Sequence, residues 1–240
     1  PSGPVTRQRG ELILSLEHEG KTYKFTRGLE ISRNFGLGQA IPLISAADDA
    51  NAEASSGAVK LTASADEAAL TLVCDIEGVM RGLAGKAPYY VEHQIDARSY
   101  GKRRTEGFSD YIRFTPQDDG SVKVGDLRPS VFGEGYSRRL DRRAIETKRE
   151  PLPGGGERLV VKIPRSYFYL HEWALGNGNS LLGFNSRVFV QDQAATTENP
   201  YPRSGRYYIV DSGIVRFDAS SLAVLELTEQ PTSRWSARFY

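Results

Sequence analysis

The stretch SLLGFNSRVFVQDQ, residues 180–193, decides the fold class because it alternates as a β-strand does. Side chains of a strand point to opposite faces with a period of two residues. One face carries Phe184, Ser186, Val188 and Val190, and the other carries Asn185, Arg187, Phe189 and Gln191. Both faces therefore hold an aromatic ring. We predict a strand with one face in a core and the other covered by a loop, a neighbouring sheet or a ligand.

Similar short runs recur along the whole chain. They are rich in Val, Ile, Leu, Phe or Tyr, and Gly, Pro, Asp or Asn bound them. They lie at residues 11–18, 21–27, 58–65, 69–77, 89–96, 110–116, 121–127, 158–164, 206–213 and 223–230. Turn signals join several of them, at 18–22, 117–121 and 153–158. Parallel sheets would need helical crossovers, so the pattern predicts an all-β, antiparallel sandwich of immunoglobulin-like architecture.

Composition and charge limit the classes of partner. The chain has 240 residues, of which 39% are hydrophobic and 25% charged, as in ordinary globular domains. Its formal net charge is +1, so no excess field predicts nucleic acid as a partner. No apolar run reaches the ~18 residues of a membrane-spanning helix. The single cysteine, Cys74, lies within a predicted strand, and we interpret it as a buried apolar residue.

Changes in composition suggest the domain organisation. Residues 1–44 are predicted to form an N-terminal β-hairpin extension that packs on the body, because a hairpin alone buries too little apolar surface. The small, polar stretch 45–57 is expected to be a surface loop or linker. Residues 58–240 form the predicted sandwich. Within it, the basic stretch 125–150 is a candidate lid or partner surface.

Several segments, taken in order, resemble family 9 carbohydrate-binding modules and the wider group of DOMON-like sandwiches. The segments are AVKLTASADEAALTLVCDIEG (58–78), YYVEHQIDARS (89–99), DYIRFTP (110–116), GGGERLVVKIPRSYF (154–168), SLLGFNSRVFVQDQ (180–193) and DSGIVRFD (211–218). The resemblance implies an immunoglobulin-like β-sandwich that binds sugar chain ends without catalysis. It also implies a bacterial, extracytoplasmic setting, whether secreted, periplasmic or at the cell surface.

The resemblance also suggests binding residues. Glu92 and Arg113 match the positions where the family places an acid and a base that grip sugar hydroxyls, and Thr115 shares the strand face of Arg113. A carboxylate accepts from vicinal hydroxyls and a guanidinium donates in a planar fork. The alternative interpretation is a cross-strand ion pair on a solvated sheet face.

The family's two clamping tryptophans have no counterpart in this chain. Lys86 stands near the first position and RYYIVDSG (206–213) near the second. Candidate replacement rings are Tyr89, Tyr90, Tyr207, Tyr208 and Trp173. Adjacent tyrosines of a strand point to opposite faces, so at most half of the tyrosines are available. Trp173 has a second interpretation, as an aromatic plug at one end of the sandwich.

Catalysis and metal binding have weaker support in the sequence. No nucleophile elbow, phosphate loop or paired histidine zinc motif is present, and a glycoside hydrolase would need Glu92 paired with Asp96 or Asp110. We expect no cofactor. Acidic turns at 63–68 and 117–121 leave structural calcium open, although such acids usually shape turns.

The sequence therefore supports a non-catalytic module that recognises polysaccharide or oligosaccharide through a polar pair and aromatics. The alternative is a structural or assembly domain of the same fold that has lost sugar binding. In that case the hairpin and the 125–150 stretch would contact other protein chains.

Overall fold

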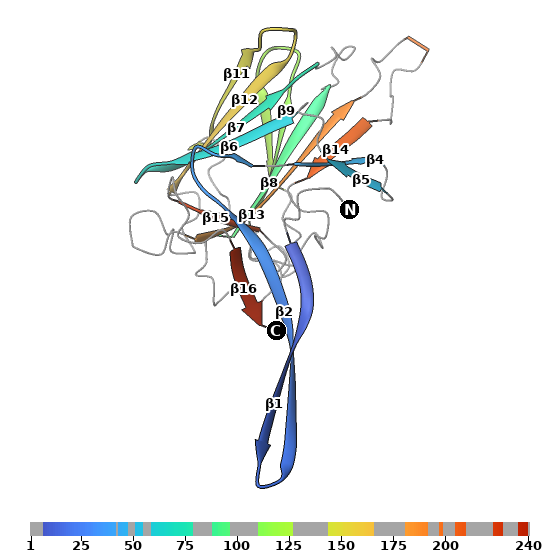
Figure 1. Ribbon diagram of the computed structural model, residues 1–240. Coiled ribbons are helices and arrows are strands. Elements are labelled where there is room, and N and C mark those ends of the chain that lie inside the picture. The colour runs from blue at the N-terminus through green and yellow to red at the C-terminus, as the bar shows by residue number, and fades with distance from the viewer. Residues whose placement is uncertain are drawn as a thin grey trace, which may run out of the picture.

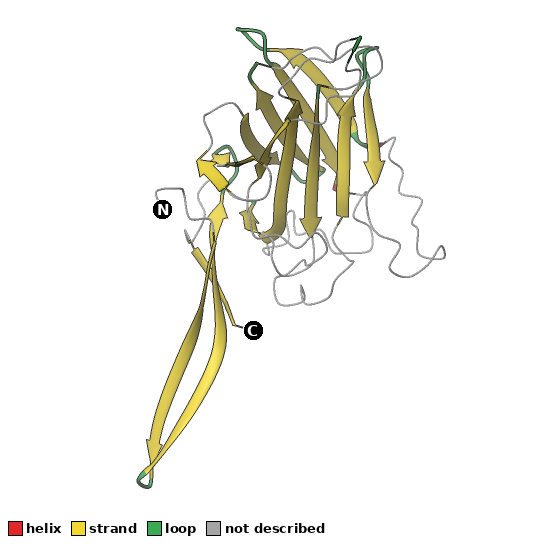
Figure 2. Ribbon diagram, turned by 90° about the vertical axis from the view of Figure 1, so that its right-hand side faces the viewer, coloured by secondary structure: helices red, strands yellow, loops and turns green. Residues whose placement is uncertain are grey.

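A computed structural model of the chain shows two layers of β-strands with a long hairpin projecting from them (Figures 1 and 2). It describes residues 7–41, 43–47, 51–54, 59–78, 88–96, 110–126, 144–165, 181–191, 197–198, 205–209, 223–227 and 235–239. Within these ranges no helix is long and apolar enough to cross a membrane.

The smaller layer is a five-stranded antiparallel sheet. Its strands, in spatial order, are β11 (Glu146–Pro151), β12 (Glu157–Pro164), β7 (Ala69–Ile76), β6 (Val59–Ala65) and β3 (Ala40–Ile41). Residues 70–76 of β7 alternate, because Leu70, Leu72, Cys74 and Ile76 are buried and the residues between them are partly exposed. Burial also raises the pKa of the Cys74 thiol, so this cysteine behaves as an apolar core residue, as the sequence predicted.

The larger layer is built around a long strand, β13 (Leu181–Gln191). On one side β13 pairs with β8 (Tyr89–Asp96), which pairs with β9 (Asp110–Pro116), and β9 pairs with β10 (Val122–Asp126). On its other side β13 pairs with β14 (Gly205–Ile209) and β15 (Ala223–Glu226). Strand β14 also pairs with β4 (Ile44–Ala47), and β4 pairs with β5 (Asn51–Ala54). Strand β15 also pairs with β2 (Lys21–Phe35). These pairs are antiparallel except for the short β15–β2 contact.

The core lies between the two layers. From the larger sheet it receives the side chains of Tyr89, Val91, His93, Ile95, Ile112, Phe114, Phe184 and Val188, all no more than 1% exposed. These are the alternate residues of β8, β9 and β13, so the opposite residues of the same strands form the outer face. The prediction of a sandwich from period-two alternation is confirmed.

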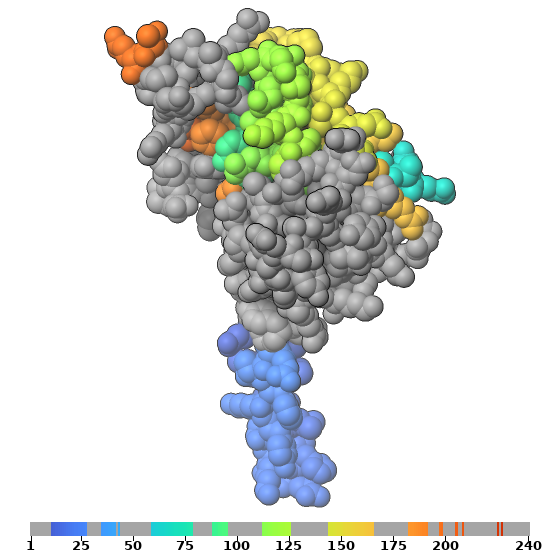
Figure 3. All heavy atoms as spheres, turned by 180° about the vertical axis from the view of Figure 1, so that it is seen from behind, coloured from blue at the N-terminus to red at the C-terminus, as the bar shows by residue number. Residues whose placement is uncertain are grey.

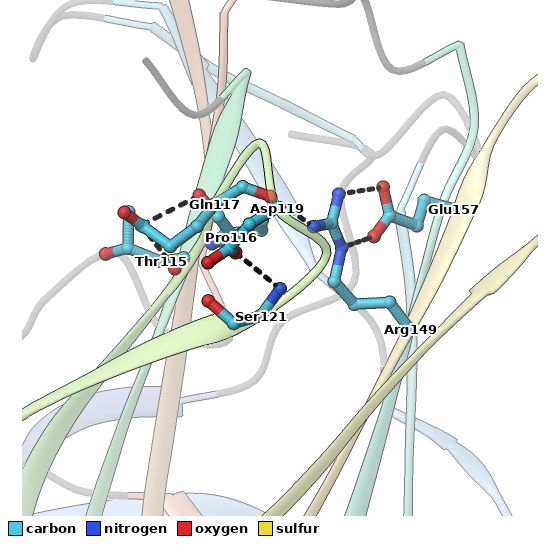
Figure 4. A network of polar contacts seen from close by, with 7 residues as sticks. All are labelled: Thr115, Pro116, Gln117, Asp119, Ser121, Arg149 and Glu157. Carbon is cyan, nitrogen blue, oxygen red and sulfur yellow. Dashed lines mark hydrogen bonds and ion pairs between the residues drawn. The ribbon is translucent and has the colours of Figure 1, made fainter. Parts of the chain in front are cut away.

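Arg149 ties the two layers together at one end (Figure 4). Its guanidinium pairs with Glu157 across the β11–β12 hairpin, with Nη2 at 3.1 Å from Oε2. Its Nη1 donates to the carbonyl oxygen of Gln117, in the β9–β10 turn, at 2.6 Å. That turn is closed by Asp119, whose Oδ1 accepts the Ser121 N–H at 2.8 Å. Arg149 therefore fixes the end of the strand that carries Arg113.

The N-terminal hairpin departs from the prediction for residues 1–44. Strand β1 (Arg7–His18) pairs with β2 over its whole length, and Glu19 and Gly20 turn the chain with φ of 51° and 72°. The hairpin does not lie on the body but projects from it as an arm (Figures 1 and 3). Strand β16 (Trp235–Phe239) pairs with β2 near the base of the arm (Figure 1). The ladder of backbone hydrogen bonds gives the arm its shape without packing on the sandwich.

Two loop predictions also change. The stretch 45–57 was expected to be a loop, yet its described residues contribute to the β4–β5 hairpin. Its small residues pair through backbone groups, which need no apolar side chains. The 125–150 stretch ends in β11, an edge strand of the five-stranded sheet, while residues 127–143 lie outside the described residues.

Stability should depend on pH through His93, which is buried at the centre of β8. Burial lowers the pKa of its ring to about 3, while an unfolded histidine titrates near ~6.5. Below the pKa of the unfolded state, the unfolded chain binds a proton that the folded chain does not. The free energy of unfolding therefore decreases as the pH is lowered. We predict a loss of about 2 kcal/mol in the free energy of unfolding between pH 7.5 and 5.

Denaturant titrations at the two pH values measure this loss. The His93→Gln variant should show a smaller loss over the same range. His18→Gln removes an exposed ring on the arm and should leave the loss unchanged. An equal loss in His93→Gln and the unsubstituted chain would contradict the assignment.

Candidate functional site

Glu92 lies at the centre of the outer face of the larger sheet. Its register partners are Arg113 on β9 and Arg187 on β13. The Nε of Arg113 donates to Glu92 Oε1 at 2.7 Å, and the Nε of Arg187 donates to Oε2 at 2.6 Å. One carboxylate therefore joins three adjacent strands. We call Glu92, Arg113 and Arg187 the triad.

The burial of these groups sets their electrostatics. The Glu92 side chain is 0% exposed, whereas those of Arg113 and Arg187 are 34% and 31% exposed. A buried carboxylate is stable only when it is paired and hydrogen-bonded, and each of its oxygens has a guanidinium here. Two guanidiniums and one carboxylate leave a formal charge of +1. The cationic edges that reach the surface are hydrogen-bond donors held in fixed positions.

An aromatic row lies beside this triad, one step along the strands. Tyr90 stacks on Phe189 with ring centroids 5.1 Å apart and planes inclined by 18°. The Arg113 guanidinium lies over the Tyr90 ring, 4.5 Å from its centroid. At Gly205 on β14 a Cβ atom would come within 2.3 Å of the Phe189 ring, so glycine lets this ring lie over the neighbouring strand. The two rings stack within one row next to Arg113 and are not spread apart as a clamp.

Buried amides border the triad on its other side. Gln94 on β8 and Asn185 on β13 are register partners, 1% and 7% exposed. The Oδ1 atom of Asn185 has no hydrogen-bond partner among the described residues. Buried oxygens usually accept a hydrogen bond. On this side of Glu92 the outer-face residues are therefore buried, so the guanidinium donors and the aromatic edges are the groups of the three rows that reach the surface.

The residues that the sequence singled out separate into three groups. Glu92 and Arg113 lie side by side, with Tyr90 next to them. Thr115 follows two residues after Arg113 on β9, and Tyr207 occupies the register position opposite Phe189. Tyr89 is 0% exposed and faces the core, so its ring cannot contact a ligand on the outer face. Trp173 lies outside the described residues.

Sequence reasoning placed Arg187 and Asn185 on the outer face but did not include them in the site. Alternation within 183–191 shows that they share a face. It does not show that β13 lies beside β8, because Arg187 and Glu92 are 95 positions apart. The pairing register supplies that information.

The other candidate acids have structural roles. Asp66 Oδ1 accepts the N–H groups of Ala68 and Ala69, both at 2.8 Å, and these hydrogen bonds lower the pKa of its carboxyl. Hydrogen bonds from Ser121 lower the pKa of Asp119. No group of three or more potential metal ligands occurs in the described part of the chain. Glu92 is held by two arginines and is not placed as a free catalytic acid.

The triad should stabilise the fold in addition to placing hydrogen-bond donors at the surface. We predict that Glu92→Gln lowers the free energy of unfolding at pH 7 by about 2 kcal/mol, because two adjacent guanidiniums lose their counter-charge. Denaturant unfolding measures the change. The matched control is Asp75→Asn, which breaks a paired but more exposed contact with Arg158 on the other sheet. A larger loss in the control than in Glu92→Gln would contradict the role assigned to the triad.

Comparisons with known proteins agree with the architecture. No protein-family model matches the chain, and no curated protein matches its sequence. Among solved structures it is similar to a family 9 carbohydrate-binding module from Caldicellulosiruptor kristjanssonii, in complex with cellotriose. The TM-score is 0.52 at 14% sequence identity, and the match covers 83% of this chain and 95% of that one. The chain therefore has the antiparallel β-sandwich fold of family 9 carbohydrate-binding modules, with an added N-terminal hairpin.

Proposed function

We propose that the chain is a non-catalytic carbohydrate-binding module and that its site is the outer face of β8, β9 and β13. The observation that carries this proposal is the triad itself. Arg113 and Arg187 are held in place by a buried carboxylate and present about a third of their surface outward. Guanidinium N–H groups in fixed positions suit sugar hydroxyl and ring oxygens, which accept charge-assisted hydrogen bonds.

Glu92 has a different role from the one that the family resemblance implies. Both of its oxygens accept from arginines, and its side chain is fully buried. We therefore assign it as a positioning residue that orients the two guanidiniums. The sugar would contact the arginines, while Glu92 reduces the conformational entropy that they lose on binding.

The neighbouring groups add apolar and polar contacts. The edges of Tyr90 and Phe189 supply apolar surface next to Arg113. Thr115 and Tyr207 extend the same row on the flanking strands. Because the described residues provide no pair of facing rings around the site, we expect weaker binding than a two-ring clamp would give.

The proposed ligand is an oligosaccharide or the end of a polysaccharide. Cellotriose is the first ligand to test, because the similar module was solved with it. Polysaccharides of this kind lie outside the cytoplasm, so we also propose an extracytoplasmic, bacterial setting for the chain. No metal or cofactor is part of this proposal.

Isothermal titration calorimetry against a panel of oligosaccharides that includes cellotriose tests the proposal. We predict that Arg113→Ala and Arg187→Ala each weaken binding about tenfold or more, because each removes charge-assisted hydrogen bonds worth ~1.5–3 kcal/mol. Arg158→Ala is the matched control. This arginine is also paired with a carboxylate, but on the outer face of the other sheet.

Two results would contradict the proposal. One is the absence of binding to every oligosaccharide of the panel at millimolar concentration by the folded, unsubstituted chain. The other is binding that Arg158→Ala weakens as much as Arg113→Ala does, since the site would then lie elsewhere.

A further inference from the structure

The arm formed by β1 and β2 exposes apolar side chains that the sandwich does not cover. Among the described residues, the exposed large hydrophobic side chains are Ile13, Leu14, Leu16, Tyr23 and Phe25, which are 44–59% exposed. All of them lie on the arm (Figure 3). The register sets Leu14 opposite Phe25 and Leu16 opposite Tyr23, so four of them share one face. Apolar side chains gathered in this way mark an interaction surface.

The arm also has an open edge. Among the described strands, β1 pairs with β2 alone, whereas β2 pairs on its other side with β16 at residues 29–33. The β1–β2 register runs without a bulge from Arg7 to His18, and β1 contains no proline. Bulges and prolines are devices that protect edge strands from further pairing. The outer edge of β1 is therefore suited to accept another strand.

The charges along β1 indicate that the strand accepted at this edge is β1 of a second copy of the chain. Arg7 and Arg9 lie at its base, Glu17 at its distal end, and Glu19 in the turn that follows. Two copies of this strand in antiparallel register centred on Ile13 set Arg7 opposite Glu19 and Arg9 opposite Glu17. The two-fold symmetry repeats both pairs. The apolar middle of each strand then lies beside that of the other, with Leu12 opposite Leu14.

Other antiparallel registers set fewer opposite charges across from each other. Centring the pair on Leu14 would keep Arg9 opposite Glu19 but set Glu11 opposite Glu17, and like charges that face each other destabilise a sheet. Centring it on Leu12 would keep Arg7 opposite Glu17, but it would set Arg9 opposite Ser15 and Glu11 opposite Ile13. Of these three registers, only the one centred on Ile13 sets both arginines opposite glutamates.

We propose that two copies of this chain associate through antiparallel pairing of their β1 edges, centred on Ile13. The contact is isologous, as in two-fold dimers in general. Since the arms project from the sandwiches, antiparallel pairing leaves the two bodies at opposite ends of a four-stranded ribbon. The apolar faces of both arms lie on the same side of that ribbon. The contact is small, so we expect association at micromolar or higher concentration.

Sedimentation velocity of the full chain, from about 1 to about 500 µM, tests the proposal. We expect a reversible, concentration-dependent dimer that weakens as salt is raised, because salt screens the charge pairs that we propose along the edge. Two double variants, Arg7→Glu with Arg9→Glu and Glu17→Lys with Glu19→Lys, should each associate at least about tenfold more weakly. Each of them places like charges at both ends of β1.

An equimolar mixture of the two double variants provides the decisive comparison. In the mixture the charges are again opposite across the edge, so the heterodimer should form at concentrations at which each variant alone stays largely monomeric. Circular dichroism of each variant checks that the strands are retained. The proposal is overturned if the unsubstituted chain stays monomeric over the whole range or if the mixture does not associate. It is also overturned if Leu14→Thr with Phe25→Thr abolishes association while both charge variants keep it, because the apolar faces would then be the contact.

Discussion

The pairing of Glu92 with two arginines is the interaction on which the outer face depends. β8 lies between β9 and β13, and its alternate residues enter a core that leaves no exposure to Val91 or Ile95. Glu92, next to Val91, points to the opposite face and is also fully buried, and a buried carboxylate requires partners. Arg113 and Arg187 provide them from both neighbouring strands. The same contact fixes the register of three strands and orients the donors that we assign to ligand binding.

Much of the fold follows from alternation in the sequence. The faces of 183–191, the burial of Cys74 and the outward direction of Glu92 and Arg113 all follow from the period of two. The register between distant strands does not, and Arg187 was therefore left out of the predicted site. Short edge strands such as β5 and β11 pair through backbone groups, so their composition does not reveal them. The projection of the arm was missed because burial, which its side chains lack, was taken as the condition for a stable hairpin.

Two surfaces of different chemistry result from this architecture. The outer face of the sandwich carries fixed cations beside aromatic edges, and the structure holds it rigid through Arg149 at the β9–β10 turn. The arm carries an open strand edge and an apolar face, and nothing in the described sandwich covers either. A module that binds sugar on one surface and a second copy on the other would present two sites to one polysaccharide. Two linked sites raise the effective affinity for a chain that spans both.

The central claim is that the guanidiniums held by Glu92 form the ligand surface. NMR spectroscopy of the arginine Nε–H groups during a cellotriose titration tests it most directly. The account predicts that the Arg113 and Arg187 resonances are resolved without ligand, because both groups donate to a buried carboxylate, and that they shift on addition of sugar. The Arg158 resonance, from the other sheet, should not move. Shifts at Arg158 with none at Arg113 and Arg187 would contradict the account.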